Sequence, residues 1–341
     1  MIKLYQQLSK NFNVKQGRLN MFALTNTTTR LAVAGLAAAA FMTTFTAQAE
    51  WKPKGPISVV IGFAAGGGTD TQARLISAEL KKRKGWNMIP SNLSGRGGVV
   101  MARKLKSMPN DGLSIGMAVT EVFGYNMLAS KKSGYKTSDF TYIATTTSSQ
   151  MGIVANTSKG WKTFKDVIAA AKKGKVFKFA GMSAKHADIN FLIEQKYGVK
   201  FNTVVLRGGR KVMNAIIAGD VDLGYGAGIQ AKAVMSGKMV NLASGLGERL
   251  RISPNAPTLV EMGIPYDIGA KFIFVAPAGI PADARKALAD AIGEVINDPS
   301  TKASKFVSKR YGGPDVVTGK KLDAYIANEI KAAKVLMKLM K

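Results

Sequence analysis

The chain has 341 residues, with 49 Lys and Arg against 21 Asp and Glu, one His and no Cys, which gives a formal net charge of +28. Without cysteine the chain can form no disulfide or thiolate metal site, and a single histidine excludes metal sites built on several histidines. Its one dense basic run, Lys81–Lys84, closes a predicted helix and has no interleaved aromatic residues, so we predict no nucleic-acid partner.

The N-terminus carries the pattern of an export signal. A basic residue, Arg30, precedes a short apolar run at 31–42, and Ala47-Gln48-Ala49 has the small-x-small pattern of a cleavage site. We predict a signal peptide over residues 1–49, removed before Glu50, and a periplasmic location. A retained anchor is the alternative, and Met21 is a second possible start besides Met1. The remaining length indicates two domains.

A strand, a glycine loop and a helix follow closely. The apolar run at 57–63 predicts the strand, and Ala73, Ile76 and Leu80 recur at helical spacing after the three glycines at 66–68. Glycines allow a ligand to approach the backbone closely, and the free amides at a helix N-terminus attract anions. The junction therefore predicts an anion site, with a purely structural turn as the alternative. Asp70 either caps the helix or contacts a ligand hydroxyl or ammonium group.

Strand-like and helix-like segments then alternate, which predicts α/β layers. A capping box at 163–166 predicts a helix that ends near Lys173. Gly219 is the predicted C-cap of another helix, and Asp220 and Asp222 precede a strand that starts at Leu223. The other predicted strands are Met88–Pro90, Ser114–Val119, Tyr142–Thr146, Gly152–Ala155, Phe177–Ala180, Thr203–Leu206 and Lys271–Ala276, and the other predicted helices are Val99–Ser107, Asp188–Tyr197, Lys211–Ala218 and three C-terminal stretches.

The only histidine, His186, lies in a predicted loop, 181–186, ahead of a helix. A histidine in that position can cap the helix or pack against its neighbours, and it can equally contact a ligand. Catalysis would need partners that the sequence does not show. We predict no catalytic residue, no cofactor and no metal.

Six motifs in order resemble the extracytoplasmic receptors of tripartite tricarboxylate transporters, also called Bug receptors. The resemblance covers essentially the whole predicted mature chain, although no single motif is specific. The motifs are Pro56–Asp70, Asn92–Gly98, Asn110–Gly112, Ile217–Asp222, Ala256–Gly263 and Ala276–Pro281.

This resemblance implies an α/β fold of two lobes, the periplasmic binding protein fold of type II, with two chain crossovers between the lobes. Lobe 1 would comprise residues 50–150 plus 270–341, and lobe 2 residues 151–269. It also implies a small organic carboxylate in the cleft: a di- or tricarboxylate, an aromatic acid or an acidic amino acid. The implied ligand contacts are Phe63, Ala64, Ala65, Gly66, Gly67, Gly68, Thr69, Asp70 and Thr120 in lobe 1, and Ser183, Ala184, His186, Arg207, Gly208 and Tyr225 in lobe 2.

The chain departs from the family pattern in those same loops. Gly62 and Ala64 replace prolines, and Arg207 stands where the family usually has P-Y-K-G. A guanidinium at that position would suit a second carboxylate, with a solvated surface arginine as the alternative. The predicted function is a periplasmic solute receptor that delivers its ligand to membrane permease subunits. A secreted enzyme on the same fold and a sensory receptor for a signalling partner are the alternatives.

Overall fold

The computed structural model describes residues 51–340. The predicted signal peptide, 1–49, and both candidate starts, Met1 and Met21, lie outside these residues. Within 51–340, no helix combines the length and the apolar character that crossing a membrane requires.

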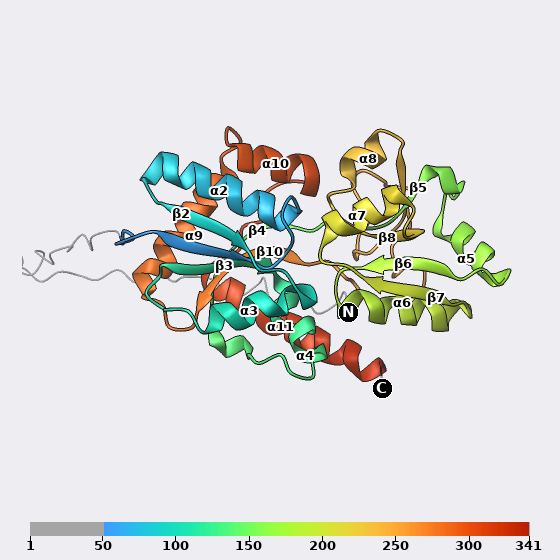
Figure 1. Cartoon of the computed structure of the whole chain (residues 1–341), viewed down its shortest axis with the longest axis horizontal. Coiled ribbons are helices and arrows are strands. Elements are labelled where there is room, and N and C mark those ends of the chain that lie inside the picture. Colours follow the sequence, from blue (N-terminus) through green and yellow to red (C-terminus); the bar gives the residue numbers. More distant parts are fainter. Residues whose placement is uncertain (1–50, 341) are drawn as a thin grey trace, which may run out of the picture. The chain divides into compact units, whose positions relative to one another are not determined.

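Two five-stranded sheets form the framework (Figure 1). The first, in the order β2-β1-β3-β10-β4, defines the first lobe, and the second, in the order β7-β6-β8-β5-β9, defines the second lobe. The strands of the first sheet are β1 (Ile57–Ile61), β2 (Met88–Asn92), β3 (Ser114–Val119), β4 (Phe140–Ser148) and β10 (Lys271–Pro277). Those of the second are β5 (Met151–Asn156), β6 (Phe177–Gly181), β7 (Phe201–Val205), β8 (Leu223–Ala227) and β9 (Met239–Ser244).

Both sheets are built to the same plan. Three parallel strands are followed by a fourth that runs antiparallel to its two neighbours, β10 in the first sheet and β5 in the second. Each fourth strand is the one with which the chain enters that sheet from the other lobe. The chain therefore crosses twice, from β4 to β5 and from β9 to β10, as predicted. The lobe limits at 150 and 270 stay a prediction.

Helices connect and cover the strands. The α-helices are α2 (Gly68–Lys84), α3 (Val99–Lys106), α4 (Tyr125–Ala129), α5 (Phe164–Lys172), α6 (Ala184–Tyr197), α7 (Gly209–Ala218), α8 (Ala231–Met235), α9 (Ala282–Asn297), α10 (Lys302–Tyr311) and α11 (Gly319–Leu339). The short 3-10 helices are η1 (Arg96–Gly98), η2 (Thr120–Phe123), η3 (Thr137–Asp139) and η4 (Thr157–Lys159).

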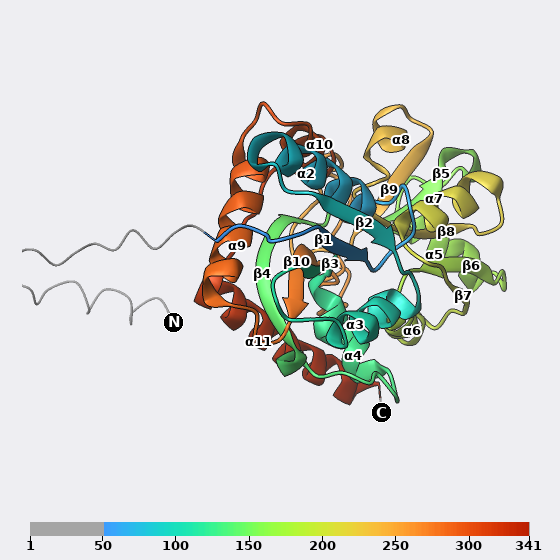
Figure 2. The ribbon, with the colours of Figure 1, turned by 60° about the vertical axis from the view of Figure 1, so that its left-hand side comes forward.

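The first sheet has an apolar core on each face (Figure 2). Helices α2, α9 and α10 supply one core, where Ile76 and Leu80 of α2 are fully buried, as their spacing predicts. Helices α3 and α11 supply the other, together with the turn η2. With both faces covered, the parallel strands can be apolar throughout, which is why Ile57–Ile61 shows no polar alternation beyond Ser58.

The last helix, α11, belongs to both lobes. Its first half contributes Leu322 and Ile326 to the core of the first lobe. Its second half contributes Ala333 and Leu336 to the core of the second lobe. This single helix therefore ties the two lobes together over its 21 residues.

Candidate functional site

The predicted glycine loop joins β1 to α2. Gly66 has φ +72°, a left-handed conformation that favours glycine. Its amide donates to Asp70 Oδ2 at 2.9 Å, and Asn92 Nδ2 donates to Asp70 Oδ1 at 2.9 Å. Burial raises the pKa of Asp70, but these hydrogen bonds and that from Arg74 outweigh it, so the net pKa is lowered. Asp70 therefore holds the loop through the amide of Gly66 and through Asn92, and its contact with a ligand stays a prediction.

The N-terminus of α2 opens onto a cavity between the lobes. No side chain caps this end, because its N-cap residue is Gly67, in an extended conformation with φ −78° and ψ 174°. Gly68 is required for packing: a β-carbon there would lie 1.9 Å from the hydroxyl oxygen of Tyr311. The first amides of α2 therefore remain available, with the positive end of the helix dipole, for a group in the cavity.

The facing wall comes from α6, which begins at Ala184, four residues earlier than predicted. His186 thus lies in the first helical turn and not in a loop. Its Nδ1 pairs with the hydroxyl of Ser183 at 2.7 Å, and its ring meets Tyr225 edge-on at 4.6 Å. Burial lowers the pKa of His186 to about 4, with Glu121 opposing the shift and Lys185 adding to it. The imidazole is therefore neutral near pH 7.

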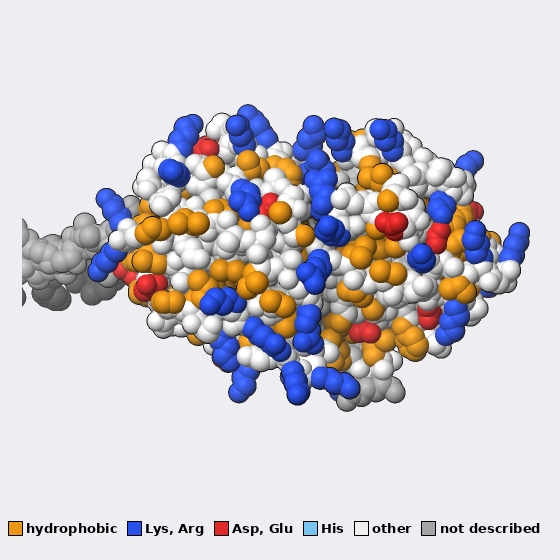
Figure 3. Space-filling model, in the orientation of Figure 1, with side chains coloured by type: hydrophobic (Ala, Val, Ile, Leu, Met, Phe, Trp, Pro, Cys, Tyr) orange, Lys and Arg blue, Asp and Glu red, His pale blue; other side chains and the backbone are white. Residues whose placement is uncertain are grey.

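The loop before α7 completes the second-lobe wall. Gly208, with φ +101°, brings the backbone against Phe63, whose ring would lie 3.5 Å from a β-carbon at this position. Arg207 and Arg210 flank this glycine, and both are exposed and line the cavity. Arg210 Nε donates to the carbonyl oxygen of Gly66 at 3.0 Å, which joins α7 to the glycine loop. Many Lys and Arg side chains lie over both lobes on the face drawn in Figure 3.

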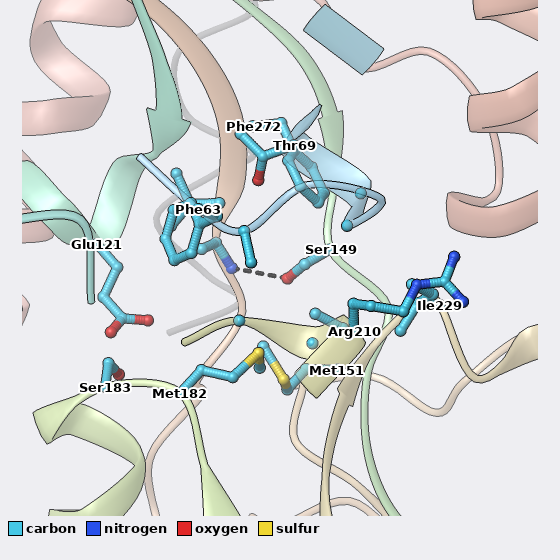
Figure 4. A pocket seen from close by; sticks show the side chains of 18 of the residues that line it. Phe63, Thr69, Glu121, Ser149, Met151, Met182, Ser183, Arg210, Ile229 and Phe272 are labelled. Carbon is cyan, nitrogen blue, oxygen red and sulfur yellow. Dashed lines mark hydrogen bonds between the residues drawn. The ribbon is translucent and has the colours of Figure 1, made fainter. Parts of the chain in front are cut away.

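These walls enclose a cavity of about 60 Å³ (Figure 4). That is room for about four to six water molecules, or for one small compact ligand. The lining residues that the sequence predicted are Phe63, Ala64, Gly67, Gly68, Thr69, Ser183, His186, Arg207 and Gly208. Whether they contact a ligand stays a prediction.

Six predicted residues do not line this cavity: Ala65, Gly66, Asp70, Thr120, Ala184 and Tyr225. Thr120 is buried and accepts a hydrogen bond from the backbone N–H of Lys271 at 3.2 Å. Tyr225 is buried in the second-lobe core, where its hydroxyl donates to Asn190 at 2.8 Å. Both side chains support neighbouring elements from behind the cavity walls.

Sequence reasoning missed other lining residues. Among these are Glu121 and Asn126 beyond β3, Ser149 in the first crossover, Met151, Met182, Arg210, Ile229, Phe272 and Tyr311. Glu121 could have been expected to line the cavity, because it directly follows Thr120 at the end of the predicted strand. Within 51–340, no group of three or more His, Asp and Glu residues is placed to hold a metal ion.

Comparisons with known proteins place this chain in a family. The model of the tripartite tricarboxylate transporter family receptor matches residues 72–341. A UPF0065 protein of Cupriavidus necator is 29% identical over 271 residues, which cover 78% of this chain and 82% of that protein.

Solved structures agree in fold. Malate-bound MatC of Rhodopseudomonas palustris has a TM-score of 0.73 at 22% identity, over 84% of this chain and 99% of MatC. An adipate-bound protein of R. palustris has a TM-score of 0.74 at 22% identity, over 84% of this chain and 97% of that one. The predicted two-lobed fold and the resemblance are both confirmed: the chain belongs to the tripartite tricarboxylate transporter receptor family.

Proposed function

We propose that this protein is a periplasmic receptor that captures one small organic carboxylate in the cavity between its lobes and delivers it to permease subunits in the membrane. The observation that carries the proposal is the uncapped N-terminus of α2, which opens into that cavity beside Gly67. Such a terminus offers N–H donors and a partial positive charge to a carboxylate without a side-chain cation.

Two further observations support this function. Related folds hold malate in MatC and adipate in a second R. palustris protein. The lobes also meet around the cavity, since Arg210 reaches Gly66, and Arg310 Nη1 donates to Ile229 O at 2.9 Å. A receptor that closes over its ligand needs contacts of this kind between the two lobes.

An enzyme on this fold is a weaker candidate. Ser183 and His186 form the one nucleophile–base contact in the cavity, yet the Nε2 atom of His186 has no hydrogen-bond partner among the described residues. In a Ser-His-Asp or Ser-His-Glu triad an acidic group orients the imidazole through its second ring nitrogen, and Glu121 makes no hydrogen bond to His186 in this part of the chain.

A ligand screen tests the proposal. Purified mature protein is heated with single compounds: di- and tricarboxylates, aromatic acids, amino acids and, as controls, neutral sugars and amines. A true ligand at 100 times its dissociation constant should stabilise the fold by about 2.7 kcal/mol, and the compound should be recovered unchanged. Stabilisation by no carboxylate would overturn the receptor function, and conversion of a bound acid into product would indicate the enzyme.

A further inference from the structure

Three buried polar atoms around the cavity have no hydrogen-bond partner in the described part of the chain. They are Glu121 Oε1, Asn126 Oδ1 and His186 Nε2, on side chains that are 4%, 4% and 2% exposed. All three residues line the same cavity. Buried polar atoms are normally satisfied, so a cluster of unsatisfied ones in one cavity points to partners supplied by a bound molecule.

Two of these atoms are acceptors. The Nδ2 atom of Asn126 faces the carbonyl oxygen of Gly97 at 2.9 Å. Since a carbonyl only accepts, this atom must be the amide nitrogen, and Oδ1 is left as the unpartnered acceptor. A carboxylate oxygen such as Glu121 Oε1 also accepts. The ligand must therefore present donors at this end of the cavity.

Glu121 has no cationic partner among the described residues. It forms no ion pair within residues 51–340, and Figure 4 shows its carboxylate directed toward Ser183 across the cavity. Glu121 also borders a wider cavity beside the crossovers, which holds Lys185 and Lys271. Lys271 is paired there with Asp315, and Lys185 forms no ion pair with Glu121. A buried carboxylate without a cationic partner is costly, which favours a ligand cation.

The opposite part of the cavity has the opposite polarity. It holds the N-terminus of α2 with Gly67 and Thr69, and Figure 4 shows Arg210 on the side away from Glu121. The cavity is therefore polarised, with an anion-binding part and an acidic part. A dicarboxylate without an amino group would leave Glu121 Oε1 and Asn126 Oδ1 without hydrogen-bond donors.

We propose that the ligand is a small amino acid in its zwitterionic form, and that Glu121 and Asn126 receive its ammonium group while its carboxylate faces the start of α2. This inference rests on the proposed carboxylate receptor and narrows its ligand class. Glu121 is then the residue that selects acids with an amino group over acids without one.

Calorimetric titration of matched pairs tests this assignment. The pairs are aspartate with succinate, glutamate with glutarate, and 4-aminobutanoate with butanoate, which differ only in the amino group. In at least one pair the amino acid should bind more than tenfold tighter than its partner. In Glu121→Gln that amino acid should lose more than tenfold in affinity, while its partner gains affinity because a negative charge is removed.

Glu294→Gln is the matched control, because Glu294 is exposed on α9 and lines neither this cavity nor the wider one, and this change should leave both affinities as they are. If succinate, glutarate and butanoate each bind as tightly as their amino counterparts, the ammonium site is overturned and the carboxylate receptor stands. Binding of neither series would overturn both. The comparison within each pair uses the unaltered protein, so it stands even where Glu121→Gln does not fold.

Discussion

The side chain of Arg210, at the start of α7, donates from Nε to the main-chain oxygen of Gly66, in the glycine loop of the other lobe, at 3.0 Å. This hydrogen bond joins the two lobes beside the cavity, between two segments 144 residues apart. It connects the segment that we propose binds the carboxylate to the lobe that must close over it.

Removal of this contact should favour the open arrangement of the lobes. In Arg210→Met the cross-lobe hydrogen bond is lost while the aliphatic length is kept, so ligand affinity should fall about threefold to tenfold, a modest loss because the pair is exposed. Small-angle scattering with bound ligand should show a larger radius of gyration than the parent. Lys211→Met, at an exposed neighbour without such a contact, serves as the control; an equal effect of both changes would remove any special role of Arg210.

Gly67→Val should abolish or strongly weaken ligand binding in a folded protein. The backbone at Gly67 is extended, so valine fits it without strain, but a β-carbon there already lies 3.1 Å from Ala64 O, and the branched side chain crowds the approach to the amides of α2. Titration of the best ligand of the screen should show more than a tenfold loss. Gly55→Val, remote from the cavity with the nearest atom 3.8 Å from its β-carbon, is the control. Full affinity in Gly67→Val would mean that the loop is only a turn.

The sequence predicted most elements because their signals are local. The capping box at Thr163 and Asp166 is present, and Gly219 caps α7 in a left-handed conformation with φ +78°. Strand β9 was missed because polar Asn241 and Ser244 are buried in it. The Nδ2 atom of Asn241 donates to Ser253 Oγ, twelve residues away, at 2.9 Å. This hydrogen bond depends on the tertiary structure, so no local sequence pattern indicates it.

The site was predictable only in part for the same reason. The resemblance to the receptor family implied Phe63, Gly67, Ser183 and Gly208 as ligand contacts, and the structure brings these four residues to one cavity. Which residue beyond the end of β3 reaches the cavity depends on the path of η2, so the prediction stopped at Thr120, one residue before Glu121. The contribution of α10 through Tyr311 depends on packing against Gly68, far away in sequence.

His186 should make the stability depend on pH in a defined window. Burial, opposed by Glu121, lowers its pKa from 6.5 to about 4. Between these pH values the unfolded chain binds a proton that the folded protein does not. The free energy of unfolding therefore carries the full contribution of the neutral His186 above pH 6.5 and falls as the pH drops toward 4, by about 3 kcal/mol at most. Urea unfolding at pH 7, 5.5 and 4.5 should show that the parent loses more stability than His186→Gln. Parallel losses in both proteins would contradict a neutral buried histidine.

The same variant tests the role of His186 in function. His186→Gln should fold and should change ligand affinity by no more than about tenfold, equivalent to about 1.4 kcal/mol. Turnover of a ligand by the parent that disappears in this variant would contradict the receptor function.

Two adjacent residues of α11 allow the effect of core packing on stability to be measured apart from the effect of helix propensity. Leu336 is 2% exposed and packs in the core of the second lobe, whereas Val335 is 57% exposed. Leu336→Ala should lower the free energy of unfolding by about 2–4 kcal/mol through lost packing and the cavity left behind. Val335→Ala should change it by less than about 0.5 kcal/mol. Chemical denaturation of both variants makes the comparison, and similar losses would mean that α11 does not brace the second lobe.

Arg207 departs from the family pattern, and we expect this residue to affect ligand specificity. It is exposed, lines the cavity at the edge of the Gly208 loop and forms no ion pair within residues 51–340, so its guanidinium is available to a second carboxylate. Arg207→Ala should reduce the affinity for a ligand with a distal carboxylate about threefold to tenfold, since solvent screening limits the gain from an exposed pair.

The measurement is calorimetric titration of two ligands that differ by one carboxylate, aspartate and alanine or succinate and butanoate, with both proteins. The loss should be confined to aspartate or succinate, because alanine and butanoate have no group to reach Arg207. Raising the salt concentration should shrink the difference between the two proteins, as expected for an exposed charge pair. Equal losses for both ligands would show that Arg207 acts on the loop and not on the distal charge, and no loss for either would show that it is a solvated surface residue.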